Sequence, residues 1–143
     1  DCVMSTVIFH NLRQAECALA AAAELARPVT LLTAPGAAAY GGPGYYLAMV
    51  EAAQARHPKA TVRAILDCGD DGALAQMAMS LGWRRLVLRG RAVVRAKVRQ
   101  IANAHGGEVL ARPPRAWDPG AEQIDIVAQC RVLLARDARR RGH

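Results

Sequence analysis

An acidic stretch interrupted by glycine, Asp67-Cys68-Gly69-Asp70-Asp71, carries the side chains in this sequence that are best suited to chemistry. Carboxylates such as those of Asp67 and Asp70 hold divalent ions through oxygen ligands or accept hydrogen bonds from sugar hydroxyls. The alternative is structural: Asp70 or Asp71 caps the helix that follows, and Asp67 forms the turn. The sequence is compatible with both the binding interpretation and the structural one.

Cys68 stands near the expected start of a helix, where a thiol pKa is often lowered. If the strands before Cys68 and His10 are neighbours, His10 could act as its base. The flanking aspartates oppose this, because negative charge disfavours a thiolate. We therefore do not expect a catalytic cysteine.

The four cysteines are Cys2, Cys17, Cys68 and Cys130. They form no CxxC pair and have no histidine at a zinc-site interval. We expect free thiols in a reducing cytoplasm and no metal site.

A second candidate site is the glycine-rich stretch 34–44 (APGAAAYGGPG). Its backbone N–H groups, together with the positive end of the helix that follows, suit an anion. Arg89 and Arg112 follow later strands and would add positive charge. The alternative is a connector that binds nothing.

These groups fall where several strands of the expected sheet end, and that edge is where ligands bind in open α/β sheets. The expected ligand-binding residues are His10, Asn11, Gly36, Gly41, Gly42, Gly44, Asp67, Cys68, Asp70 and Arg89. Neither GxGxxG after the first strand nor GxxxxGK[ST] is present, so the cofactor is unknown and the sequence does not decide whether the protein is an enzyme.

Apolar, β-branched runs alternate with helical patterns along the whole chain. The expected strands are 3–10, 29–33, 61–66, 85–88 and 108–111, and the expected helices are 12–26, 45–57, 72–81, 92–105 and 121–139. The alternation predicts an α/β fold, a three-layer α/β/α arrangement with a five-stranded parallel sheet. For the strand order we prefer the flavodoxin-like 2-1-3-4-5 to the Rossmann-like 3-2-1-4-5.

With 143 residues, the chain is expected to form a single α/β domain, 1–143. A proline-rich connector is expected at 112–120 and a basic tail at 139–143. No apolar run reaches the roughly 18 to 20 residues of a membrane span, and no secretory signal opens the sequence. We expect a cytoplasmic protein without a membrane partner, and leave open whether residues precede Asp1.

The positive charge is concentrated late in the sequence: residues 1–83 carry five basic and seven acidic side chains, and residues 84–143 carry fourteen and five. Arg91, Arg95 and Arg99 would lie along one helix face, where they could bind phosphate backbones. Aromatic side chains for stacking on bases are few, so we do not expect nucleic acid as a partner and expect a solvated face instead. The same helices could assemble with other copies of the chain.

Asp67 after the third strand and Arg112-Pro113 after the fifth make the chain similar to the receiver domains of response regulators. The resemblance implies that Asp67 stands at the phosphoacceptor position and Arg112-Pro113 at that of a Lys-Pro pair. His10-Asn11 replaces the acidic pair of that family, and Arg89 replaces its hydroxyl residue. A degenerate, non-phosphorylated receiver-like domain is implied.

The sequence therefore predicts a small domain that binds an anionic small molecule at the carboxyl edge of its sheet. The alternative is a non-catalytic protein-interaction module that assembles through its C-terminal helices.

Overall fold

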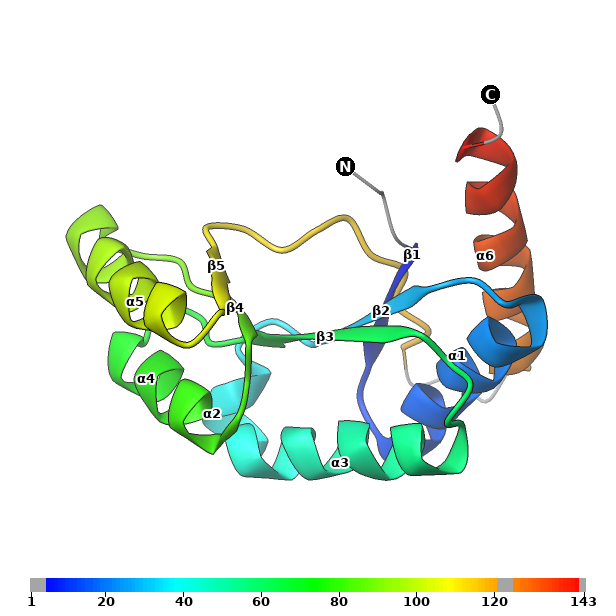
Figure 1. Ribbon diagram of the computed structural model, residues 1–143, viewed down its shortest axis with the longest axis horizontal. Helices are drawn as coiled ribbons and strands as arrows, with labels where there is room; N and C mark the ends of the chain where they lie inside the picture. Colours follow the sequence, from blue (N-terminus) through cyan, green and yellow to red (C-terminus); the bar gives the residue numbers. More distant parts are fainter. Residues whose placement is uncertain (1–4, 121–124, 142–143) are drawn as a thin grey trace. The chain divides into compact units, whose positions relative to one another are not determined.

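The computed structural model describes residues 5–120 and 125–141, with only the backbone described for 138–141. The strands are β1 (Ser5–Phe9), β2 (Val29–Thr33), β3 (Val62–Asp67), β4 (Arg85–Val87) and β5 (Glu108–Leu110). The helices are α1 (Leu12–Leu25), α2 (Ala37–Gly41), α3 (Pro43–Arg56), α4 (Gly72–Leu81), α5 (Ala92–Ala104) and α6 (Ile126–Arg141). Figure 1 shows how strands and helices alternate along the chain.

The strands form one five-stranded parallel sheet, which confirms the predicted α/β class. The order is β1-β2-β3-β4-β5, so each strand neighbours the next one in the sequence. In the later part of the sheet, Leu66 of β3 pairs with Leu86 of β4, and Leu86 pairs with Val109 of β5.

This order differs from both orders that we expected. Because β2 lies between β1 and β3, those two strands are not neighbours, and the sheet has no point at which the strand order reverses. Receiver domains share the flavodoxin-like order, so the resemblance to them does not extend to the sheet. The patterns predicted the strands correctly. They did not predict the strand order, because buried parallel strands all have similar apolar sequences, which do not indicate which strand pairs with which.

The chain divides into two compact units, and the single-domain expectation stays a prediction. Unit 1 comprises 1–31, 49–63 and 115–143, and unit 2 comprises 32–48 and 64–114.

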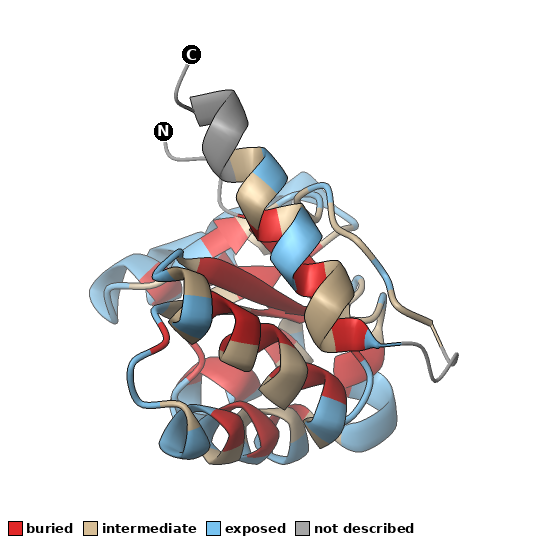
Figure 2. Ribbon diagram, turned by 90° about the vertical axis from the view of Figure 1, so that its right-hand side faces the viewer, coloured by how far each residue is buried: buried red, intermediate tan, exposed pale blue. Residues whose placement is uncertain are grey.

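Unit 1 is organised around α1, which the side chain of Asn11 caps by accepting from the N–H of Gln14. The alanine-rich stripe of this helix is buried, and α6 packs against it. Cys130 and Leu134 of α6 are buried, and Figure 2 shows buried and exposed residues alternating along this helix. Small side chains on α1 allow this close approach.

Segment 115–120 also belongs to unit 1. Val7 of β1 forms a parallel bridge with Trp117, whose N–H donates to the oxygen of Thr6 at 3.0 Å. The expected proline-rich connector therefore extends the edge of β1 at this point.

Unit 2 contains the consecutive elements α4, β4, α5 and β5. Asp71 caps α4 by accepting from the N–H of Leu74 at 3.0 Å, and Gly82 ends the helix with a φ of 122°. Trp83 is buried just after Gly82, and its Nε1 donates to the oxygen of Pro43 at 2.9 Å. This bond ties the start of α3 to the end of α4.

Some predicted boundaries were wrong. The stretch 34–44, expected to be irregular, contains α2 and the start of α3, because three consecutive alanines favour a helix once Gly36 has made the turn. On α5, Val98 and Ala102 are buried, whereas Ile101 is exposed. Parts of the predicted elements lie outside the described residues: 3–4 of the first strand, 121–124 of the last helix, and part of the basic tail. Cys2 also lies outside them.

None of the helices that the structure describes combines the length and the apolar character that a membrane-spanning helix requires.

Candidate functional site

The carboxylate of Asp67, at the end of β3, organises the carboxyl edge of unit 2. Oδ1 accepts from the backbone N–H groups of Gly36 at 3.1 Å and Gly69 at 2.9 Å. Arg89 donates to the same carboxylate through both terminal nitrogens, Nη1 to Oδ1 at 2.8 Å and Nη2 to Oδ2 at 2.9 Å. The Asp67 side chain is only 1% exposed. It is therefore enclosed by this chain's own donors.

Strand ends position this group of residues. The backbone N–H of Asp67 donates to Oγ1 of Thr33 at 2.9 Å, which joins the end of β3 to the end of β2. Arg89 follows β4, the neighbour of β3, and its own N–H donates to the oxygen of Gly69 at 2.7 Å. The parallel order thus brings three strand ends together at one edge.

The loops that follow these strands also touch one another. A side-chain carbon built at Gly69 would lie 4.0 Å from Cα of Gly36, and one built at Gly90 would lie 3.1 Å from Cβ of Asp70. Gly36, Gly69 and Gly90 all have positive φ values, which glycine adopts without strain. The three loops therefore form one continuous rim.

Arg89 is the exposed member of the ion pair, with 38% of its side chain accessible. The hydrogen bonds to Asp67 raise the pKa of Arg89 above its ordinary value, although burial opposes them. The bidentate geometry uses two of the five N–H donors of the guanidinium. The others have no partner within the described residues.

More unused donors lie at the junction of β4 and α5. Arg91 precedes the helix and makes no side-chain cap, so the first N–H groups of α5 have no side-chain acceptor there. Arg95 donates through Nη1 to the oxygen of Gly90 at 3.1 Å, while its Nε is buried without a hydrogen-bond partner among the described residues. This junction therefore offers several N–H donors without a partner among the described residues.

Cys68, unlike Arg89, is buried. Its side chain is 2% exposed, and its Sγ lies 4.0 Å from the oxygen of Leu66. Burial, with the charges of Asp67 and Asp71, raises the pKa of the thiol to about 12. Nothing in its surroundings supports an activated thiol or a contact to a ligand.

The expected glycines occupy different positions. Gly36 forms the turn before α2 and donates to Asp67, whereas Gly41 and Gly44 lie within helices. Gly42 joins α2 to α3, and its N–H donates to the oxygen of Ala38 at 3.1 Å. The stretch 34–44 is therefore mostly helical, and Gly36 is its member at the Asp67 carboxylate.

His10 and Asn11 belong to unit 1 and have partners there. Nε2 of His10 lies 2.7 Å from Oδ1 of Asp118, and the side chains are 37% and 45% exposed. Burial raises the pKa of Asp118, but hydrogen bonds from His10 and Gly120 lower it to a net value below the ordinary range. Asn11 serves as the cap of α1.

Buried Gln14 holds this second group of residues in place. Its Oε1 accepts from the N–H of His10 at 2.8 Å, and its Nε2 donates to the oxygen of Gly120 at 2.8 Å. The end of β1 is thereby fixed to segment 115–120.

Sequence reasoning did not include Thr33, Gln14 or Asp118. A hydroxyl residue at the end of VTLLT and an Asp-Pro-Gly turn are visible in the sequence, but each is a common local feature. Only the fold shows that Thr33 faces Asp67 and that Asp118 faces His10. Among the residues that the structure describes, no group of three or more His, Cys, Asp or Glu side chains could hold a metal ion.

Comparison with known proteins gives no further guidance: no protein-family model matches the chain, and no curated protein matches it.

Proposed function

We propose that unit 2 binds a small anion, such as a phosphate or carboxylate group, where β4 meets α5. The observation that carries the proposal is Arg89: a buried aspartate holds its guanidinium in a fixed orientation, yet the group stays accessible and keeps unused donors. Arginine recognises phosphates and carboxylates through such planar sets of donors.

In this proposal Asp67 positions Arg89 and does not contact the ligand. Its oxygens already accept four hydrogen bonds, and ion pairing fixes a side chain that would otherwise sample many rotamers. Because less entropy is lost on binding, a preorganised arginine binds an anion more favourably.

The start of α5 supplies a second contribution. Its uncapped N–H groups carry partial positive charge, and the unpartnered Nε of Arg95 would gain an acceptor from a bound anion. Asp70 lies close by at Gly90, so the ligand has to be small enough to avoid its carboxylate. We propose binding alone, without a reaction.

Thermal unfolding in sodium phosphate, with sodium chloride at equal ionic strength as reference, tests this function. A ligand at about 100 times its Kd stabilises the folded state by about 2.7 kcal/mol, so the melting temperature should rise in phosphate. Arg89→Lys keeps the charge but cannot pair bidentately with Asp67, and Arg95→Gln leaves the Asp67 pair intact. Each should remove at least half of the shift.

Arg84→Gln is the matched control, because Arg84 lies at the opposite end of β4. This variant should respond to phosphate like the unaltered protein. An equal response from the Arg89 and Arg95 variants would rule out this site.

A second function, a protein-interaction module, is favoured by exposed apolar side chains on two helices of unit 2. Met77 and Leu81 of α4 and Val93 and Ile101 of α5 are exposed. Exposed apolar patches often mark interaction surfaces. Sedimentation tests this second function: self-association through these apolar side chains should persist as salt rises, whereas association through the arginine face of α5 should weaken.

A further inference from the structure

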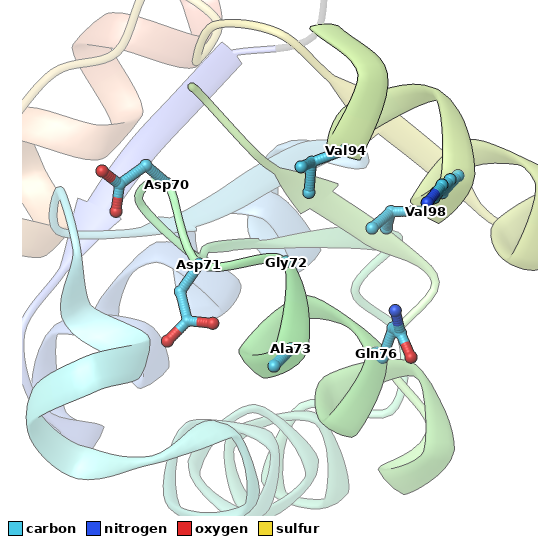
Figure 3. Close-up of a pocket in the computed structure, with 8 residues that line it drawn as sticks. Asp70, Asp71, Gly72, Ala73, Gln76, Val94 and Val98 are labelled. Atoms are coloured by element: carbon cyan, nitrogen blue, oxygen red, sulfur yellow. The ribbon is translucent and has the colours of Figure 1, made fainter. Parts of the chain in front are cut away.

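A pocket of about 550 Å³ opens between α4 and α5 in unit 2, apart from the Asp67–Arg89 pair. Its lining includes Asp70, Gly72 and Gln76 on one side and Val94, Lys97 and Val98 on the other. Figure 3 shows Val94 and Val98 on α5 and Gly72, Ala73 and Gln76 on α4 around this space. Five of its eight lining residues are exposed, so it is an open groove at the surface of this unit.

The two valines give the pocket an apolar wall. Val98 is fully buried and Val94 partly exposed, so the wall begins at the core and reaches the surface. A side-chain carbon built at Gly72 would lie 2.6 Å from Cγ1 of Val94, so α4 approaches α5 very closely at this point. A ligand there would cover apolar surface without opening the helix contact.

The polar side chains around this wall are unused. Asp71 is occupied as the cap of α4, but Asp70, Gln76 and Lys97 make no hydrogen bond or ion pair among the described residues. The pocket therefore offers one free carboxylate, one free amide and one free ammonium group.

The charged groups stand at different levels of the pocket. Asp70 precedes the first turn of α4, whereas Gln76 lies one turn into the helix. Lys97 lies almost one turn beyond Val94, the residue nearest Gly72. A ligand that contacts both charged groups therefore has to reach from the loop before α4 to the second turn of α5.

We propose that this pocket binds a small zwitterion of the amino-acid type with an apolar side chain. Its ammonium group pairs with Asp70, its carboxylate pairs with Lys97 and accepts from the amide of Gln76, and its apolar part covers Val94 and Val98. This site differs from the anion site at Arg89 in using Gln76, Lys97 and the two valines, while Asp70 lies beside both sites.

Binding of L-leucine, followed through the methyl NMR signals of Val94 and Val98, tests the proposal. Two analogues each lack one charge: 3-methylbutylamine has no carboxylate and 4-methylpentanoate has no amine. We expect both to bind at least tenfold more weakly than leucine, which corresponds to about 1.4 kcal/mol. Asp70→Asn and Lys97→Met should each weaken leucine binding to a similar degree.

Glu51→Gln and Lys59→Met are the matched controls, because both residues are exposed and lie in unit 1. They should leave leucine binding unchanged. The proposal is overturned if leucine gives no saturable shift at about 10 mM, if either analogue binds as tightly, or if both pocket variants retain full affinity. The Lys97→Met result does not depend on phosphate binding at Arg89, because Lys97 takes no part in that site.

Discussion

Asp67 shows how one residue can look like a ligand contact in the sequence and act as a structural centre in the fold. Its carboxylate ties the turn at Gly36, the turn at Gly69 and the side chain of Arg89 to the end of β3. A buried carboxylate with this many donors has little capacity left for an external group. The accessible member of this ion pair is the guanidinium group of Arg89.

Asp67→Asn should destabilise the protein by about 3 kcal/mol, because it breaks a buried ion pair and leaves a donor group against backbone N–H groups. Urea unfolding measures the change. Asp70→Asn, at an exposed and unpaired neighbour, should change stability by about 0.5 kcal/mol or less. Equal unfolding midpoints for the two variants would contradict the central role of Asp67.

Cys68 and Cys130 should resist alkylation in the folded protein, since both are buried and have raised pKa values. Cys17 is partly exposed and provides an internal comparison. Mass spectrometry after brief iodoacetamide treatment near pH 8 should find Cys17 labelled ahead of both, and all three labelled in urea. Labelling of Cys68 as fast as that of Cys17 would refute the description of its surroundings.

At the scale of elements, α4 depends on its cap. Asp71→Ala should cost about 1 kcal/mol of stability, because the N–H of Leu74 loses its acceptor. Asp71→Ser retains a capping oxygen and should recover most of the loss in the same urea measurement. If serine performs no better than alanine, capping is not the reason for the aspartate.

The contact between α6 and α1 is the second element-scale dependence. Leu134 of α6 is buried, so Leu134→Ala should cost about 3 kcal/mol through lost burial and a residual cavity. Val132→Ala, on the exposed face of the same helix, should cost about 0.5 kcal/mol or less. Similar losses for the two variants would mean that α6 does not depend on this face.

Local signals explain which elements the sequence predicted well. The bounds of β2 and α4 were predicted correctly, because Pro28 ends the preceding helical pattern and Asp71 and Gly82 bracket α4. The short α2 was missed, since glycine and proline on both sides of Ala37–Gly41 indicated a loop. Sequence propensities therefore predict long helices and strands better than they predict a helix of five residues.

Long-range arrangement was predictable only in part. The expected site residues Gly36, Asp67 and Arg89 do lie together, because each lies at or just after the end of a strand of one parallel sheet. Their mutual pairing was not predictable, because the sequence does not show that the arginine would turn toward the aspartate. For the same reason the strand order was wrong, and with it the expected proximity of β1 and β3.

The whole molecule should lose stability in alkaline solution. Burial raises the pKa values of Cys68 and Cys130 from 9.0 to about 12, so between these pH values the unfolded chain releases thiol protons that the folded chain retains. Stability therefore falls as pH rises above 9, by at most about 1.4 kcal/mol per pH unit for each thiol. Urea unfolding at about pH 8 and about pH 10.5 measures the decline.

Cys130→Ala should show a shallower decline than the unaltered protein, because one of the two thiols is gone. Equal slopes would show that other groups cause the alkaline loss.

The sequential strand order also has a consequence for how the chain folds. Each strand pairs with one that is only a single strand-helix unit away in the sequence, and such short separations favour rapid folding. During synthesis, each new unit can add to the strand already in place. The pairing of Trp117 with Val7 is the exception, because it joins positions about 110 residues apart. The pairing of Trp117 with Val7 should therefore form late in folding. The packing of α6, which follows this segment in the chain, should form late as well.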